Sequence, residues 1–322
     1  MRLTIVNDLA MPPEALKLLR DGTTGHRLML PRAPTSVLAP STPDPLFGEA
    51  DIAFGQPDPR AIEQSVRLKW VHVGSSGITR YDTPEFRAMA LARGLLVTNS
   101  ASVYQEPCAL HALSFLLAQA RELPLALATR APGGSQVWDE LRAACVPLRE
   151  QTLLIVGYGS IGERLVELAV PLGLRVRAYR RRPRGDETIP LVLPAELGNA
   201  LAHADHVMNI LPLSPETLGF FDSVRFAQFK PGAVFYNIGR GATVDQTALL
   251  EALWARKLKA AWLDVTDPEP LPLDHPLLAE PRCYVTPHVA GGHAAEASNL
   301  VRHFLKNLTR FVRQEPLLDR VM

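Results

Sequence analysis

The 322-residue sequence is poor in cysteine, in net charge and in long apolar runs. Its three cysteines, Cys108, Cys145 and Cys283, are far apart and form no C-x-x-C pair, which argues against a disulfide framework and against a zinc site. A formal charge of +1 gives no general attraction to nucleic acid or to a membrane. No apolar run is long enough for a signal peptide or a membrane span. We therefore expect an unprocessed cytoplasmic protein with no metal, whose partners are small molecules.

Internal repeats, coiled-coil heptads and low-complexity tracts are also missing. The length exceeds that of one typical domain, so two compact units are expected. Short apolar runs alternate with helix-like pieces over residues 2–98, and this alternation predicts a small parallel sheet. The proline-rich stretch 31–48 is predicted as a surface loop. A long helix is predicted at 105–121, followed by a second loop at 131–147.

The clearest motif follows an apolar run at 153–156, where the chain reads G-x-G-x-x-G and continues into an amphipathic segment. This order predicts a strand, a tight turn and a helix. Such a turn brings backbone N–H groups at the helix N-terminus to a pyrophosphate, so it predicts dinucleotide binding. The alternative is a purely structural turn. The predicted cofactor-binding residues here are Gly157, Tyr158, Gly159, Ser160, Ile161 and Gly162.

Further strands follow this motif at regular intervals. Together with 153–156 they make six, with helical segments between most of them, and six strands with crossover helices are the full form of a dinucleotide-binding sheet. The later five are predicted at 175–179, 206–211, 233–238, 260–265 and 284–286. A final helix at 296–312 can return to the first domain.

An arginine-rich turn ends the second strand of this sheet. NAD-binding proteins usually place an acidic residue about twenty positions past the first glycine, against the ribose 2′-hydroxyl. This chain has Arg180-Arg181-Arg182-Pro183-Arg184 instead. Guanidinium groups bind a 2′-phosphate through charge-assisted hydrogen bonds. Arg180 and Arg181 therefore predict that NADP(H) is favoured and NAD(H) is possible, the alternative being a solvated basic turn.

Three charged residues follow the ends of later strands: Arg240, Glu269 and His288. Residues just past the carboxyl ends of parallel strands converge on the ligand crevice, so these three can meet. Arg240 can pair with a substrate carboxylate and polarise the adjacent carbonyl. His288 can donate a proton to the carbonyl oxygen as hydride arrives, and a hydrogen bond from the imidazole to the Glu269 carboxylate favours the imidazolium and fixes its orientation. Each residue alone has an ordinary structural explanation, but their joint occurrence in this order predicts hydride transfer to a 2-oxo acid.

As a set, these motifs resemble the D-isomer-specific 2-hydroxyacid dehydrogenases. The resemblance covers nearly the whole chain: G-x-G-x-I-G at 157–162, L-P-x-S-P-E-T at 211–217, N-x-G-R-G-x-x-V-D at 237–245, L-D-V-x-x-x-E-P at 263–270 and T-P-H at 286–288. It implies that Arg240, Glu269 and His288 are the catalytic trio. It also implies further cofactor contacts, at Leu211, Pro212, Thr217, Ile238, Gly239, Asp264 and Gly291. The arginine-rich turn is similar to that of NADP-using glyoxylate/hydroxypyruvate reductases.

The resemblance also implies a fold and a substrate site. It predicts a Rossmann dinucleotide-binding domain, 101–289, inserted into a smaller flavodoxin-like parallel-sheet substrate domain, 1–100 and 290–322, with hinges near 98–104 and 287–293 and substrate bound in the cleft between the domains. The substrate carboxylate should meet backbone N–H groups at Ser75, Ser76 and Gly77, where this chain departs from the commoner G-V/A-G-x-D form. Another departure is Cys108-Ala109-Leu110-His111, in place of V-A-E-H, and no chemistry is assigned to Glu106 or His111.

The expected reaction is the NADPH-dependent reduction of a short 2-oxo acid, of the glyoxylate or hydroxypyruvate type, to the D-2-hydroxy acid. Alternatives on the same scaffold are an enzyme acting on phosphite or formate and a non-enzymatic dinucleotide-sensing corepressor. A homodimer is expected, and the helix at 105–121 is a candidate for its subunit interface. His203-x-x-His206 has a spacing that could bind a metal, but a structural role is favoured. Trp138 is expected to be a packing anchor.

Overall fold

The computed structural model describes residues 2–31, 35, 42–130 and 132–322. The chain forms two compact units. Unit 1 comprises residues 1–104 and 292–322, and unit 2 comprises residues 105–291. The crossings thus lie at 104/105 and 291/292, compared with predicted domain bounds of 100/101 and 289/290. None of the described helices is both long enough and apolar enough to cross a membrane.

Unit 1 is built on a five-stranded parallel sheet with the order β2-β1-β3-β4-β5. This 2-1-3-4-5 order is that of a flavodoxin-like sheet, as predicted. The sequence did not predict β2, which is three residues long and contains no buried residue. The strands are β1 (Thr4–Asn7), β2 (Arg27–Met29), β3 (Ile52–Gly55), β4 (Trp70–Val73) and β5 (Leu96–Thr98).

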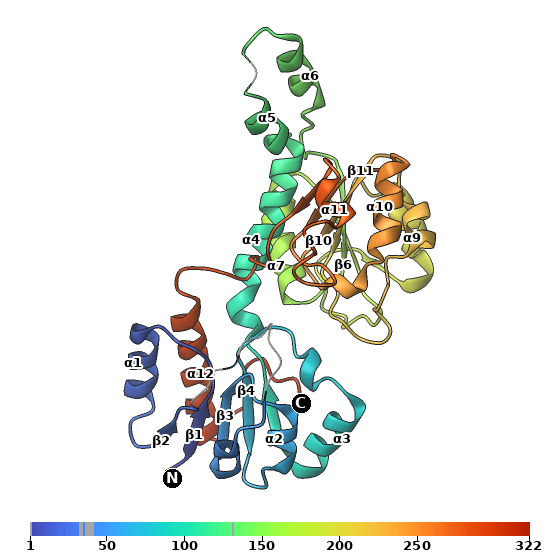
Figure 1. Cartoon of the computed structure of the whole chain (residues 1–322). Helices are drawn as coiled ribbons and strands as arrows, with labels where there is room; N and C mark the ends of the chain where they lie inside the picture. The colour runs from blue at the N-terminus through green and yellow to red at the C-terminus, as the bar shows by residue number, and fades with distance from the viewer. Residues whose placement is uncertain (1, 32–34, 36–41, 131) are drawn as a thin grey trace. The chain divides into compact units, whose positions relative to one another are not determined.

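Helices cover both faces of this sheet (Figure 1). On one face α1 (Pro13–Gly22) lies beside α12 (Glu296–Val312), and the two pack on an apolar core that contains Trp70 and Phe304. On the other face α2 (Pro59–Gln64) and α3 (Pro84–Arg93) bury a second core. The short helices η1 (Pro45–Glu49) and η2 (Thr79–Tyr81) complete the unit. The last residues lie along β5, where the N–H of Val321 donates to the carbonyl of Val97 (2.9 Å).

Unit 2 contains a seven-stranded parallel sheet with the order β12-β11-β10-β9-β6-β7-β8. Counted from β6, this is the 3-2-1-4-5-6 order of dinucleotide-binding sheets with a seventh strand added, which confirms the predicted fold class. The two-residue strand β8 was not predicted, because two residues carry no periodicity. The strands are β6 (Thr152–Val156), β7 (Arg175–Tyr179), β8 (Leu191–Val192), β9 (His206–Asn209), β10 (Ala233–Asn237), β11 (Leu258–Leu263) and β12 (Cys283–Val285).

The helices of unit 2 pack on this sheet through apolar side chains. On one face α8, α9, α10 and α11 enclose a phenylalanine-rich core around Phe221 and Phe235. Helix α4, which begins in unit 1 and continues into unit 2, packs near β11, where the indole N–H of Trp262 donates to the side-chain oxygen of Gln119 (2.8 Å). The helices are α4 (Ala101–Ala120), α7 (Ser160–Ala169), η3 (Val170–Leu172), η4 (Pro194–Glu196), α8 (Leu197–His203), α9 (Ser223–Gln228), η5 (Gly241–Thr243), α10 (Gln246–Trp254) and α11 (Pro276–Ala279).

Two predicted loops differ from the structure. The stretch 131–147 was predicted as loop, yet it contains α6 (Gln136–Ala144), which follows α5 (Leu123–Thr129). The hydroxyl of Ser135 caps α6 by accepting a hydrogen bond from the N–H of Trp138 (3.2 Å), and this cap outweighs the preceding glycines. In the predicted loop 31–48, η1 begins at Pro45, whereas residues 32–34 and 36–41 lie outside the described part of the chain.

Candidate active site

The three predicted catalytic residues follow three adjacent strands of unit 2. Arg240 follows β10, Glu269 follows β11 and His288 follows β12. Because β10, β11 and β12 are parallel neighbours, their carboxyl ends lie at one edge of the sheet. The three residues, which are far apart in the sequence, therefore lie at the same edge of the sheet.

His288 and Glu269 form a hydrogen-bonded pair. The Nδ1 atom of His288 lies 2.5 Å from Oε1 of Glu269. The backbone of His288 has a positive φ of 51°, and its N–H donates to the carbonyl of Asp264 (2.9 Å). About a quarter of each side chain is exposed, 27% for His288 and 29% for Glu269, so the imidazole is oriented yet remains accessible. With Nδ1 held by the carboxylate, Nε2 is the nitrogen that can exchange a proton with a ligand.

Arg240 is partly buried, and its charge acts on this pair through Glu269. Its Nη1 donates to the carbonyl of Gly239 (2.6 Å), and its own carbonyl accepts from the side chains of Asn237 (3.1 Å) and Thr243 (2.6 Å). Burial lowers the pKa of the Arg240 guanidinium, while the Glu269 carboxylate acts in the opposite direction. A guanidinium that has lost much of its water is well suited to bind a carboxylate through charge-assisted hydrogen bonds.

Asp264 fixes the backbone that leads to and from His288. Its buried carboxylate accepts hydrogen bonds from the hydroxyl of Thr286 (2.6 Å) and from the N–H groups of Val289 and Ala290 (both 2.9 Å). The Nε2 atom of His111 lies 3.5 Å from the same carboxylate. Burial lowers the pKa of His111, and the charge of Asp264 opposes this effect. No chemistry was assigned to His111 from the sequence, and the structure places it as a support for Asp264.

The glycine-rich turn has the form that a dinucleotide site needs. It connects β6 to α7, and β6 neighbours β9 at the point where the strand order reverses. Gly157 has a φ of 103°, and a Cβ there would lie 2.7 Å from the backbone of Ile210, so only glycine fits. At Gly159, which precedes α7, a Cβ would meet no atom within 4 Å. No atom thus crowds the chain just before the helix N-terminus, where Ser160, Ile161 and Gly162 begin the helix, and helix N-termini of this kind bind phosphate groups.

The arginine turn follows β7 directly. The Nη1 atom of Arg180 is buried and has no hydrogen-bond partner among the described residues, although it lies 3.5 Å from the carboxylate of Glu187. Arg181 is more exposed and lies 3.7 Å from Glu216. A buried guanidinium nitrogen without a hydrogen-bond acceptor fits a phosphate oxygen, so this turn is compatible with a 2′-phosphate.

Among the other predicted cofactor residues, Leu211, Pro212 and Thr217 follow β9, and Ile238 and Gly239 follow β10. Leu211 and Ile238 are buried, and Tyr158 is buried in the glycine-rich turn. The hydroxyl of Thr217 donates to the carbonyl of Pro212 (2.6 Å) and closes the turn after β9. Gly239 comes directly after Ile238, and Gly291 is the last residue of unit 2.

A buried amide pair that the sequence did not reveal joins these two strand ends. The side-chain amide of Asn209 donates to Asn237 (3.0 Å) and to the hydroxyl of Thr243 (2.7 Å). Asn237 in turn accepts from the N–H of Gly239 (3.0 Å). The only available signal was a polar residue at the end of each apolar strand. These bonds set the backbone that carries Arg240.

The predicted substrate loop belongs to unit 1. Ser75, Ser76 and Gly77 follow the carboxyl end of β4. Ser75 is buried, whereas Ser76 and Gly77 are partly exposed. A parallel sheet binds ligands beyond the carboxyl ends of its strands, and the loop occupies such a position.

The weaker candidates have structural partners. His206 bonds to Tyr236 (2.9 Å) and Gln151 (2.5 Å), whereas His203 bonds to the carbonyl of Asn199. Burial lowers the pKa of His206 to about 4. Glu106 pairs with Arg164, and Trp138 lies on α6 beneath the guanidinium of Arg142. In the described part of the chain, no group of three histidine, cysteine or acidic residues is arranged to hold a metal ion.

Comparison with known proteins gives one family. The model of the NAD binding domain of the D-isomer specific 2-hydroxyacid dehydrogenases matches residues 113–290. The chain is 32% identical over 266 residues to human glyoxylate reductase/hydroxypyruvate reductase, covering 81% of this chain and 79% of the human protein. It is also 32% identical over 249 residues to D-3-phosphoglycerate dehydrogenase of Mycobacterium bovis, covering 75% of this chain and 44% of that protein.

The structural comparison agrees. The crystal structure of an NADPH-dependent glyoxylate/hydroxypyruvate reductase from Sinorhizobium meliloti, in complex with NADP and sulfate, superposes with a TM-score of 0.77 and 25% identity, covering 99% of this chain and 98% of that one. The matched region contains the glycine-rich turn, Arg240, Glu269 and His288. The chain therefore belongs to the D-isomer specific 2-hydroxyacid dehydrogenase family and is an oxidoreductase with an NAD(P)-binding domain.

Proposed function

We propose that this enzyme reduces a short 2-oxo acid, of the glyoxylate or hydroxypyruvate type, to the D-2-hydroxy acid with NADPH. In this proposal unit 2 binds the dinucleotide, and the loop of unit 1 at 75–77 contributes backbone N–H groups to the substrate carboxylate. The observation that carries it is the hydrogen bond between His288 and Glu269, formed at the sheet edge that also holds the partly buried Arg240. The names of the human and Sinorhizobium meliloti relatives support the substrate class.

Each residue of the trio has one role. Arg240 binds the carboxylate of the 2-oxo acid and polarises the neighbouring carbonyl, which orients the substrate and withdraws electron density from the carbon to be reduced. His288 donates the proton of Nε2 to the carbonyl oxygen, and in the oxidative direction it removes this proton from the hydroxyl. Glu269 accepts the hydrogen bond from Nδ1, so the ring is fixed and its positive charge is stabilised.

The cofactor would be held by the glycine-rich turn and the arginine turn. Bound NADPH supplies the hydride. The N-terminus of α7 would bind the pyrophosphate, and Arg180 and Arg181 would bind the 2′-phosphate. The buried Nη1 of Arg180, which lacks a hydrogen-bond acceptor among the described residues, supports the preference for NADP(H) over NAD(H).

The reaction is tested by measuring NADPH and NADH oxidation with a panel of 2-oxo acids. His288→Ala should lower kcat roughly 100-fold or more, the usual size of general acid–base catalysis, while NADPH binding measured by fluorescence persists. His203→Ala, a change on the exposed end of α8, is the matched control. A near-native kcat in His288→Ala would refute the assignment of His288 as the acid–base residue.

A second candidate substrate comes from the likeness to a D-3-phosphoglycerate dehydrogenase. Oxidation of D-3-phosphoglycerate is therefore assayed with NAD and NADP in parallel. If this substrate gives a higher kcat/KM than every short 2-hydroxy acid, the proposed substrate class is wrong, whereas the roles of the trio are unaffected.

The cofactor preference has its own test. The double variant Arg180→Ser with Arg181→Ser should raise KM for NADPH by ~100-fold or more, because hydrogen bonds to charged groups contribute roughly 1.5–3 kcal/mol each. KM for NADH should change little. Arg175→Ser, at an exposed position of β7, serves as the control. Equal changes for both cofactors would refute the role of the turn.

The same proposal includes a homodimer. Helices α5 and α6 contain no buried residue, and they extend from the end of α4 (Figure 1). Leu125 and Leu127 are 52% and 73% exposed, which suits contact with a second copy. Light scattering should give a dimer for the wild type and for the control Leu91→Glu, but a monomer for Leu125→Glu with Leu127→Glu.

The three free thiols fit a reducing compartment, and cytoplasmic localisation stays a prediction.

A further inference from the structure

The loop after β4 presents its polar groups in two directions. Three successive carbonyls are occupied within unit 1. The Ser75 carbonyl accepts from the N–H of Ser100 (3.0 Å), the Ser76 carbonyl from the side-chain amide of Asn99 (2.6 Å), and the Gly77 carbonyl from the hydroxyl of Ser75 (2.7 Å). By contrast, the N–H groups of residues 76–78 donate to no group among the described residues. Consecutive free N–H groups of this kind form a site for a carboxylate.

One support of the loop is a buried chain of hydrogen bonds across the carboxyl ends of β1, β3 and β4. The side-chain amide of Gln56 donates to the hydroxyl of Ser75 (2.9 Å), which thereby is aimed at Gly77. The N–H of Gln56 donates to the carboxylate of Asp8 (2.8 Å). A Cβ at Gly55 would lie 1.8 Å from this carboxylate, so the approach of Asp8 requires glycine. Asp8, Gln56 and Ser75 are all at least nine-tenths buried.

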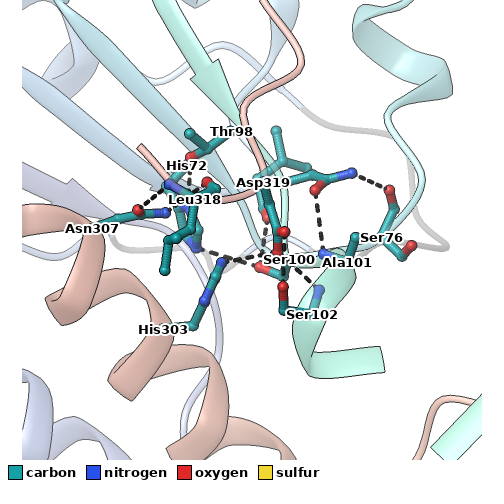
Figure 2. Close-up of polar contacts among 12 residues, drawn as sticks. His72, Ser76, Thr98, Ser100, Ala101, Ser102, His303, Asn307, Leu318 and Asp319 are labelled. Atoms are coloured by element: carbon teal, nitrogen blue, oxygen red, sulfur yellow. Dashed lines mark hydrogen bonds and ion pairs between the residues drawn. The ribbon is translucent and has the colours of Figure 1, made fainter. Parts of the chain in front are cut away.

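The second support comes from the end of the chain, at Asp319 (Figure 2). The carboxylate of Asp319 accepts from the N–H and the hydroxyl of Ser102 (both 2.8 Å), and its carbonyl accepts from the N–H of Asn99 (3.0 Å). His303 of α12 lies 3.1 Å from the same carboxylate. Asn99, which holds the Ser76 carbonyl, is thereby fixed by the C-terminal segment.

We propose that Gln56 and Asn99 are positioning residues of the carboxylate site, which turn the loop carbonyls inward so that the N–H groups of residues 76–78 face the substrate. This inference rests on the proposed function. Gln56 acts through the Ser75 hydroxyl, and Asn99 acts on the Ser76 carbonyl. Loss of either bond lets a carbonyl dipole turn toward the carboxylate, which weakens binding of the 2-oxo acid without touching the dinucleotide site or the trio.

Gln56→Met removes the amide at similar volume, and Asn99→Asp removes the donor but keeps the oxygen that accepts from Ala101 (3.2 Å). Gln56→Met should raise KM for glyoxylate by ~3- to 10-fold, the range of one neutral hydrogen bond, and Asn99→Asp should raise it at least as much because it also adds a negative charge; kcat and KM for NADPH should stay within about twofold. Gln64→Met, at the exposed end of α2, is the control and should change nothing. Unfolding curves of each variant serve to check that it folds.

A double-mutant cycle tests the proposed route through Ser75. Because Gln56 and Ser75 act on the same carbonyl, Gln56→Met with Ser75→Ala should raise KM no more than the larger single effect. If the double variant raises KM by the product of the two single effects, Gln56 and Ser75 act independently and the proposed route is wrong. An unchanged KM in Gln56→Met, or an equal change in KM for NADPH, would also overturn the proposal.

A binding measurement separates this inference from the proposed reaction. Titration of ¹⁵N-labelled enzyme with oxalate, a dicarboxylate probe, should shift the amide signals of residues 76–78, and Gln56→Met should weaken this binding by a similar ~3- to 10-fold. If the wild type turns over no 2-oxo acid but these shifts occur, the proposed reaction falls and the positioning role stands. If oxalate shifts none of these amides, or shifts them equally in Gln56→Met, the positioning role falls whatever the turnover.

Discussion

Asp8 makes the stability of unit 1 depend on pH in an unusual direction. Burial raises the pKa of this carboxyl from 3.8 to about 6, against the lowering effects of its hydrogen bonds and of Arg80. Between these two pH values the folded protein holds a proton that the unfolded chain has released. The contribution of Asp8 to the free energy of unfolding therefore falls as the pH rises through this window, and it is constant above the window.

The size of the effect follows from the shift. Two pKa units correspond to about 3 kcal/mol, so at neutral pH the ionised Asp8 lowers the stability of unit 1 by about this amount relative to strongly acidic solution. Asp8→Asn keeps an oxygen to accept from the N–H of Gln56 and cannot ionise. We expect the variant to gain about 2 kcal/mol over the wild type between about pH 4.5 and about pH 7.5.

The assay is urea unfolding at these two pH values, followed by tryptophan fluorescence, to which Trp70, fully buried in unit 1, contributes. Only the difference between wild type and variant is interpreted, since other carboxyls titrate in both. Asp21→Asn, at an exposed residue of α1, is the control and should follow the wild type. A difference between wild type and Asp8→Asn that is the same at both pH values would refute this reasoning.

Three further changes have defined outcomes. Glu269→Gln should lower kcat by roughly 100-fold with KM for NADPH unchanged, because a neutral amide does not stabilise the imidazolium; retained kcat in a steady-state assay would contradict this. Thr286→Val removes the hydroxyl bond to Asp264 and should destabilise unit 2 by about 1.5–3 kcal/mol in urea unfolding, whereas Thr286→Ser should not. Phe304→Ala, which removes a ring stacked on Phe54 at 4.3 Å, should cost about 3–5 kcal/mol in unit 1, and a loss below about 1 kcal/mol would show that the core refills the space.

The parts of the fold that were predictable are those in which a local pattern decides the structure. The apolar run before Gly157 and the helix after it can be recognised within twenty residues, and every long buried strand was predicted. The misses are β2 and β8, which are two to three residues long and only partly buried, and α6, which depends on the single cap of Ser135. The two strands form because neighbouring strands of their sheets complete them.

The same distinction applies to the candidate site. Arg240, Glu269 and His288 could be named from the sequence because each stands at a strand end. Their supports could not, because these depend on which strands are neighbours. The amide pair of Asn209 and Asn237 exists only because β9 lies beside β10 in register. Likewise, His111 reaches Asp264 only because α4 packs on the sheet of unit 2.

The substrate has to be decided outside the residues that identify the family. The family model matches residues 113–290, which lie within unit 2, and the trio lies there too. At 32% identity the chain matches both a glyoxylate reductase/hydroxypyruvate reductase and a D-3-phosphoglycerate dehydrogenase, so these shared motifs do not distinguish a small 2-oxo acid from a phosphorylated one. In unit 1 the loop proposed for the substrate contains Ser75 and Ser76, which Gln56 and Asn99 hold through hydrogen bonds. Exchange of these four residues should therefore alter the ranking of substrates by KM, while substitutions in the trio should lower kcat for all of them.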